Sequence, residues 1–233
     1  MKLLNDLLKS AIVAGVALGA STAVAQDQLY SNTENPANVD FSVEEGGVEF
    51  GDQIQLAFPS EAAPEGEFYL AELESLLFQY FADVSTDARL RVYNNNGDQI
   101  ALGDGTFADA PGDVIFDSGT FALPAAVGST VTVPLNGGAG TFTESSTVTW
   151  SIEFATPFAG LSLAGPPETG NGFTDFWRKD GDSWKLENVT GQADSSFQAI
   201  VTGSVEAVPE PSTIALGVFA GLMFVVRGFR RKA

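Results

Sequence analysis

Apolar and polar residues alternate along much of the chain. Between Val48 and Phe58 the apolar side chains take every second position, and only Asp52 breaks the order. The segment from Thr147 to Phe154 alternates throughout. A period of two is typical of a β-strand that buries one face. Shorter runs with the same period occur at 90–92, 131–135, 184–186 and 197–201.

Clusters of Asn, Asp and Gly separate these runs and predict turns. They lie at 94–97, 103–105, 136–138 and 180–182. About nine or ten short strands with this spacing indicate an antiparallel β-sandwich of jelly-roll-like form. We expect this all-β domain to span residues 41–207, and we expect a polar leader at 26–40 to precede it.

The segment from Phe68 to Phe81 carries two conflicting patterns. Leu70, Leu73, Leu77 and Tyr80 follow helical spacing, and the Ala, Glu and Leu content agrees with a helix. The segment also alternates in part, and its Phe and Tyr residues favour a strand. We interpret it as a strand, because the context of a sandwich tends to override local propensity.

The first residues have the three parts of a secretory signal. Lys2 and Lys9 supply positive charge, and the apolar run at 11–20 is too short to span a bilayer as a stable helix. A small-x-small tripeptide follows, and we expect signal peptidase to cut after it, leaving a signal peptide of residues 1–25. The residues that define this cut are Ala23, Ala25 and Gln26. An uncleaved anchor is the alternative, which the tripeptide and the polar stretch after it disfavour.

The last residues combine a proline motif, an apolar stretch and a basic end. Pro209 and Pro211 exclude a helix at the motif. The apolar residues at 214–226 then predict a single transmembrane helix. The basic residues after it would stay cytoplasmic under the positive-inside rule. They are Arg227, Arg230, Arg231 and Lys232.

This order of features, with the literal Val208-Pro209-Glu210-Pro211, closely resembles the PEP-CTERM sorting signal of Gram-negative bacteria. That signal is also called the ice-binding protein C-terminal domain, a label that says nothing of the domain before it. The resemblance covers residues 208–233. It implies that exosortase, a membrane protease-transpeptidase, recognises Pro209, Glu210 and Pro211 and cuts near them. The protein would then leave the inner membrane for the cell surface or the exopolysaccharide (biofilm) matrix.

The middle of the chain resembles a domain often found on PEP-CTERM proteins. The resemblance implies an exported all-β module of unknown function. The segments that carry it are 88–97, 115–119, 149–154, 164–167 and 175–181.

The amino-acid composition excludes several kinds of catalytic and metal site. With no His and no Cys, the chain has no disulfide, no thiolate nucleophile, no Ser-His-Asp triad and no zinc or haem site of the usual kind. There are 30 acidic and 11 basic residues, a net charge of −19, which argues against nucleic acid as a partner. Residues 26–211 alone hold 29 acidic and 5 basic residues, so 29 − 5 gives a net charge of −24. The five are Arg89, Arg91, Arg178, Lys179 and Lys185.

Two carboxylates come under consideration for acid–base catalysis. Glu153 lies on a predicted strand among aromatic residues, and Glu187 follows Trp184. A β-sandwich glycoside hydrolase or lyase would use such a pair. Strand alternation, however, places Glu153 on the solvated face, and we expect no enzyme.

Acidic turns suggest calcium as a cofactor, since oxygen-rich loops bind hard cations without His or Cys. The alternative is that these residues simply form turns. The candidate ligands fall into two groups, the first containing Asp98, Asp104 and Asp109 and the second containing Asp175, Asp180 and Asp182.

Aromatic and basic residues concentrate around 173–185. Trp177, Arg178 and Trp184 are candidate contacts for a sugar, because exposed aromatic rings stack on pyranose faces. The alternative is that the two tryptophans close one end of the core and that Arg178 pairs with a carboxylate. We therefore expect an exported structural or adhesive protein that uses signal peptidase, exosortase and exopolysaccharide as partners. A carbohydrate-binding module is the alternative.

Overall fold

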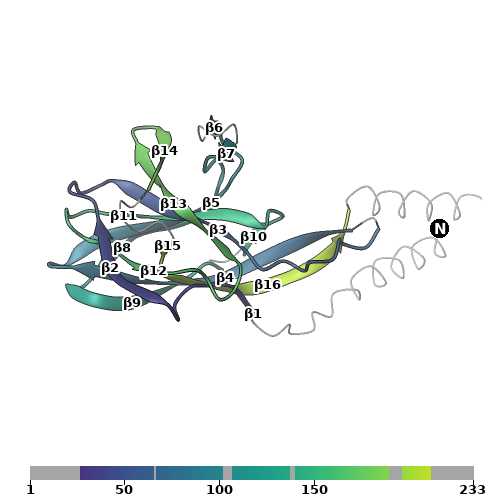
Figure 1. Ribbon diagram of the computed structural model, residues 1–233, viewed down its shortest axis with the longest axis horizontal. Coiled ribbons are helices and arrows are strands. Elements are labelled where there is room, and N and C mark those ends of the chain that lie inside the picture. The colour runs from purple at the N-terminus through teal and green to yellow at the C-terminus, as the bar shows by residue number, and fades with distance from the viewer. Residues whose placement is uncertain (1–26, 66, 102–106, 137–139, 189–195, 211–233) are drawn as a thin grey trace, which may run out of the picture.

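The computed structural model describes residues 27–65, 67–101, 107–136, 140–188 and 196–210. They form two antiparallel β-sheets packed face to face, as the all-β prediction requires (Figure 1). The described residues contain no helix long and apolar enough to cross a membrane. The predicted signal peptide, transmembrane segment and basic tail lie outside these ranges.

The larger sheet has eight strands. Its main order is β1-β16-β4-β12-β15, with β9 and β10 also paired to β4, and β2 paired to β12. Their bounds are β1 Asp27–Ser31, β2 Pro36–Ser42, β4 Glu67–Ala82, β9 Ala126–Pro134, β10 Thr141–Thr143, β12 Gly160–Ala164, β15 Ser196–Phe197 and β16 Ala199–Pro209.

The smaller sheet has six strands, in the order β14-β13-β3-β11-β5-β8. Their bounds are β3 Glu49–Gln55, β5 Thr86–Asn94, β8 Val114–Leu123, β11 Thr147–Phe154, β13 Asn171–Asp180 and β14 Ser183–Glu187. A separate pair, β6 Gln99–Ala101 with β7 Phe107–Asp109, forms its own two-stranded sheet.

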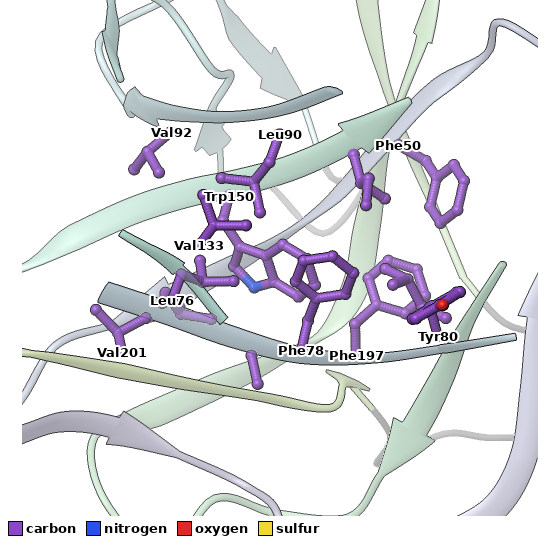
Figure 2. Packing of buried hydrophobic residues seen from close by; sticks show 14 of the residues in the cluster. Phe50, Leu76, Phe78, Tyr80, Leu90, Val92, Val133, Trp150, Phe197 and Val201 are labelled. Atoms are coloured by element: carbon purple, nitrogen blue, oxygen red, sulfur yellow. The ribbon is translucent and has the colours of Figure 1, made fainter. Parts of the chain in front are cut away.

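The core lies between the two sheets, where the alternation in the sequence placed it. The apolar residues of β11 are at most 1% exposed, and Trp150 among them is fully buried. Trp150 packs against Phe78 from the larger sheet, with ring centroids 6.1 Å apart, and against Phe197, 6.2 Å away (Figure 2). The two faces therefore interlock through aromatic rings from both sheets.

The conflicting segment is a strand, β4, which confirms the prediction. Its pairing with β16 shifts register between Thr202 and Gly203, opposite Ser75 and Leu73, so β4 contains one extra residue there. This bulge lets Leu73 and Leu76 both bury their side chains, although they are three positions apart. The buried positions of this strand therefore include one step of three residues, whereas Leu70 and Leu77 of the helical pattern are only half-buried.

The prediction that residues 26–40 form a polar leader outside the sandwich is wrong. Strand β1 pairs with β16, and β2 pairs with β12. Tyr30 and Asn32 are fully buried. The Asn32 amide donates to the Phe197 carbonyl (3.0 Å) and accepts from the Ala199 amide (2.8 Å), so a polar residue enters the core with its hydrogen bonds satisfied. Composition alone does not show such pairing.

Strands β4 and β16 continue together beyond the body of the sandwich (Figure 1). Strand β1 accompanies β16 only as far as Gly203, which pairs with Asp27. From Ser204 to Pro209 the only described strand that pairs with β16 is β4. We call the end of this pairing, residues 67–70 with 206–209, the ribbon, because β4 has no other described partner there either.

Asp52, the residue that breaks the alternation of β3, is fully buried on the core side. Its Oδ2 accepts a hydrogen bond from the Phe197 amide at 2.9 Å, and its Oδ1 has no hydrogen-bond partner among the described residues. Burial, with a smaller contribution from the charge of Asp175, raises the pKa of Asp52 well above its ordinary value. The core therefore favours the protonated carboxyl group.

This assignment predicts how Asp52→Asn changes stability. Because the folded pKa is raised, the stability associated with Asp52 is present below its unfolded pKa, about 3.9, and is lost as pH rises toward the folded value. Asn cannot ionise, so the free energy of unfolding of the variant, relative to that of the wild type, should increase from about pH 4 upward, by at most about 1.4 kcal/mol per pH unit. Urea unfolding between pH 4 and 8 measures this, with Asp83→Asn in the exposed turn after β4 as the control. Parallel curves for the wild type and Asp52→Asn would contradict it.

Candidate functional site

The outer face of the six-stranded sheet carries a charged cleft of about 590 Å³. Strands β3, β5, β11 and β13 form its floor, and the turn between β13 and β14 forms its rim. Four of the five basic residues in the stretch 26–211 line it. They are Arg91, Arg178, Lys179 and Lys185. In a chain with so few positive charges, this concentration makes the cleft the candidate functional site.

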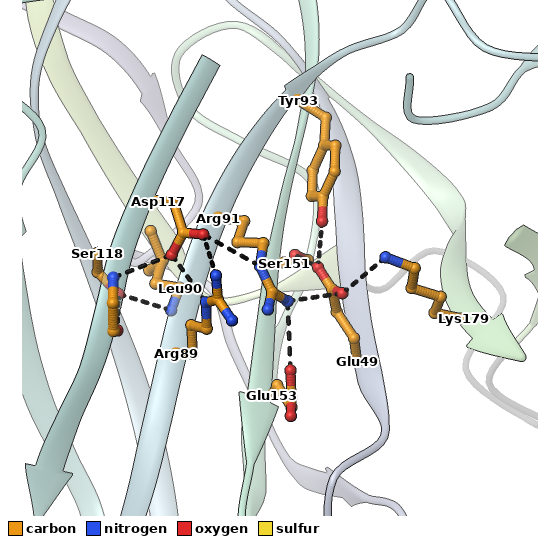
Figure 3. A network of polar contacts seen from close by, with 11 residues as sticks. Glu49, Arg89, Leu90, Arg91, Tyr93, Asp117, Ser118, Ser151, Glu153 and Lys179 are labelled. Carbon is orange, nitrogen blue, oxygen red and sulfur yellow. Dashed lines mark hydrogen bonds and ion pairs between the residues drawn. The ribbon is translucent and has the colours of Figure 1, made fainter. Parts of the chain in front are cut away.

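Glu49 on β3 lines the floor of the cleft, although only 4% of its side chain is exposed. It accepts hydrogen bonds from the Tyr93 and Ser151 hydroxyls, each at 2.6 Å (Figure 3). Its other carboxylate oxygen lies 2.7 Å from an Arg91 nitrogen and 3.3 Å from Lys179 Nζ. Four groups from three neighbouring strands therefore converge on one carboxylate.

The environment of Glu49 favours its ionised form. Burial by itself raises the pKa of Glu49, and it is the largest single effect. Hydrogen bonds from Ser151 and Tyr93, together with the charges of Arg91 and Lys179, outweigh burial and lower the pKa. Burial and the same carboxylate raise the pKa of Tyr93, so its hydroxyl stays protonated and donates.

Arg91 extends the network to two further carboxylates and to one further strand, β8. It lies 3.3 Å from Glu153 on β11 and 3.6 Å from Asp117 on β8. Asp117 also accepts hydrogen bonds from Arg89, which, as the largest effect, lowers its pKa to about 2. Five strands of one sheet are thus joined by charged side chains on the outer face. We call this set of side chains the Glu49 network. Its members are Glu49, Arg89, Arg91, Tyr93, Asp117, Ser151, Glu153 and Lys179.

The structure contradicts Trp177 as a contact for a sugar, because its side chain is fully buried. It lies opposite Gly51, where a Cβ would come within 2.2 Å of the Trp150 carbonyl oxygen. Its indole nitrogen donates to Gln53 Oε1 at 3.1 Å. Trp177 is thus a packing residue of the outer face of the sheet rather than of the core between the sheets.

Trp184 is half-buried and its ring is engaged. The Tyr93 ring meets it edge-on at 5.4 Å, and Lys179 Nζ lies 5.3 Å from its centroid. Neither tryptophan lines the cleft. Of the three predicted contacts only Arg178 does, and its guanidinium lies 3.9 Å from Glu187, as the alternative interpretation expected of it.

The two candidate catalytic carboxylates, Glu153 and Glu187, both line the cleft. Each is paired with an arginine: Glu153 with Arg91, and Glu187 with Arg178. Both carboxylates are therefore already engaged in ion pairs across the cleft. Glu153 lies on the outer face, as the alternation of β11 predicted.

The predicted calcium ligands are dispersed. Asp104 lies outside the described residues, Asp98 precedes β6, and Asp109 is the last residue of β7. Asp180 pairs with Lys185 at the β13–β14 turn. Asp175 instead lines a separate hollow that Asp109 also borders. Within the described ranges, no three acidic side chains are grouped so as to hold a metal ion.

Comparison with known proteins assigns the chain to no group. No family model matches it, and no curated protein matches it. The resemblance to the sorting signal therefore depends on the residues at 208–233 themselves.

Sequence reasoning missed Glu49, Arg91 and Tyr93 as members of a site. A signal was present: Arg89 and Arg91 are two basic residues of equal parity in a strongly acidic chain, and Glu49 and Glu153 hold outward positions on their strands. What the sequence did not show is the order of the strands, which brings β3, β5, β11 and β13 together.

The contacts of the Glu49 network predict that Glu49→Gln strongly destabilises the protein. The substitution removes the closest partner of Arg91, whose side chain is only 12% exposed, and we expect a loss of about 3 kcal/mol in the free energy of unfolding at pH 7. Because the folded pKa of Glu49 is lowered, its stabilisation is present above its unfolded pKa, near 4.5, and is lost as pH falls through the folded value. The deficit of the variant should therefore shrink in acid, measured by urea unfolding at pH 7 and pH 3.

Glu153→Gln is the matched control. Its side chain is 34% exposed, and a partly exposed pair of this kind contributes about 1 kcal/mol or less. Equal losses for the two variants would show that Glu49 holds no special place in the network.

Proposed function

We propose that the chain is an exported protein that exosortase sorts to the surface or exopolysaccharide matrix of a Gram-negative bacterium. In this proposal the jelly-roll-like sandwich is a structural or adhesive module, and the apolar C-terminal segment is a temporary transmembrane anchor. The proposal rests on the Pro-Glu-Pro motif in the sequence and on the place of its first residue, Pro209, at the end of the ribbon.

The ribbon presents the first part of the motif in extended form. Val208 and Pro209 are the last residues of β16 and pair with Phe68 and Glu67 of β4. Pro209 and Glu210 are exposed. Between Ser204 and Pro209, no described strand pairs with the edge of β16 that faces away from β4. An extended segment with one open edge is a form that proteases commonly bind, by adding a strand of their own.

The position of the ribbon also suits a tether. Both the first described residue and the last described strand leave the sandwich at the ribbon end (Figure 1). The cleft belongs to the other sheet. An anchored molecule would therefore hold its cleft away from the junction with the membrane.

Replacing Pro209-Glu210-Pro211 with three alanines tests the sorting. Alanine favours a helix and removes the recognition charge, so uncleaved protein should accumulate in the inner membrane. A tag after Gln26 and membrane fractionation in a host that carries exosortase would show this. Glu206→Ala, which removes one acidic charge from the same strand and keeps the motif, should sort normally. Surface protein of normal size from the triple variant would mean that the motif is only a linker.

Carbohydrate binding is the second candidate, and the cleft is the observation that favours it. Its concave surface brings basic side chains together with Asp182 and Glu187, and such groups bind sugar hydroxyls. No aromatic side chain of the described residues lines it, so stacking would contribute little to any such binding.

A glycan array distinguishes the two candidates. A structural module should bind no glycan specifically. If the cleft binds one, Arg178→Ala should weaken binding by about tenfold, the loss of one charged hydrogen bond. Arg89→Ala, on the same sheet but outside the cleft, should leave it unchanged. Equal effects of both variants would place the glycan elsewhere.

A further inference from the structure

The charges of this chain are unevenly distributed. Residues 26–211 carry a net charge of −24, yet no charged residue occurs between Asp117 and Glu144. This stretch contains the end of β8, all of β9 and all of β10. A surface as acidic as the rest repels other copies of the chain, whereas a neutral surface does not.

The neutral stretch forms an open edge. Of the described strands, β9 pairs only with β4, and β8 pairs only with β5. They therefore end the two sheets on the same side of the sandwich (Figure 1). A groove of about 430 Å³ lies between them, and Phe116, Phe121, Val131 and Val133 supply its apolar lining.

Two other edge strands of the described structure carry features that discourage pairing. Strand β14 contains Lys185 and Glu187, and β2 contains Pro36 and Asp40. Charges and prolines of this kind keep sheets from joining edge to edge. Strand β9 has a glycine at positive φ, Gly128, near one end and Pro134 at the other. Between them Ser129 to Val133 has neither charge nor proline.

We propose that the open window of β9, Ser129 to Val133, pairs with the same window of a second copy of this chain. Identical strands can pair antiparallel across a two-fold axis, which gives a closed, self-complementary contact. With Gly128 and Pro134 limiting the window, the axis passes through Val131. Thr130 of one copy then faces Thr132 of the other.

The side chains suit this register. Thr130 and Thr132 are exposed, so they meet on the outer surface of the joined sheet. Cross-strand threonine pairs stabilise antiparallel sheets. Val131 and Val133 point inward, where the second copy would shield the groove from water. The inference concerns the domain alone and does not depend on the sorting proposal.

Cysteine cross-linking tests the register, because the chain has no cysteine of its own. Residues directly opposite in an antiparallel pair have Cα atoms about 4.5–5.5 Å apart, within the range for a disulfide. We expect full-length Thr130→Cys mixed with full-length Thr132→Cys to form a disulfide dimer at least tenfold faster than either variant alone. Equal rates for the mixture and the single variants would overturn the pairing.

Sedimentation of the full chain in mild detergent tests the association itself. The wild type should dimerise more in about 0.5 M salt than in about 0.05 M salt, because salt screens the repulsion between acidic copies. Thr130→Asp with Thr132→Asp should abolish the dimer. Ser60→Asp with Ser85→Asp adds the same charge at exposed turn positions and should leave the dimer intact at high salt.

Three results would overturn the proposal. The first is a wild type that stays monomeric at high salt, and the second is equal dissociation of the two double variants. The third is a monomer in which the thiol of Thr132→Cys reacts slowly with an added reagent, because another segment of the same chain would then cover the edge. Far-ultraviolet circular dichroism of each variant verifies that the sheets remain folded.

Discussion

The few positive charges of this acidic domain all lie on strands of the six-stranded sheet, and two of them, Arg91 and Lys179, meet at the buried carboxylate of Glu49. Glu49 accepts hydrogen bonds from two hydroxyl groups and forms ion pairs with two cationic side chains. One of these, Arg91, also pairs with Glu153 and Asp117. With no disulfide in the chain, the strands of this sheet rely on backbone ladders, the aromatic core and this network. The strands that this network joins form the floor of the cleft beneath the β13–β14 turn.

The sequence predicted the all-β sandwich correctly because a period of two survives wherever one face of a strand is buried, as in β11. It failed where burial is achieved by pairing polar groups. Asn32 enters the core through hydrogen bonds to Phe197 and Ala199, and nothing in the composition of residues 26–40 shows those partners. The candidate site was predictable only in part, since Trp177 was expected on a ligand surface and lies buried against Gly51. Which side of a strand is covered depends on strand order, which no local pattern encodes.

Asp52 and Glu49 show that two carboxyl groups of one strand can be buried with opposite consequences. Glu49 faces donors and cations, whereas Asp52 faces apolar rings and accepts one backbone hydrogen bond outside its own strand. The first is stabilised as an anion and the second as a neutral acid. At neutral pH, Glu49 on the outer face of this sheet therefore stabilises the folded state, whereas Asp52 on its inner face lowers the stability.

The pairing of β4 with β16 also limits the order in which the molecule is completed. Strand β4 lies at the centre of the larger sheet, yet its longest ladder is with the last described strand of the chain. Strand β1, the first one described, pairs with that same last strand. Contacts between residues so far apart in sequence close slowly, because the loop between them must first be ordered. During synthesis the N-terminus emerges first, so the larger sheet cannot be completed until residues 199–209, which form β16, have been made. The domain therefore stays incompletely folded until that point.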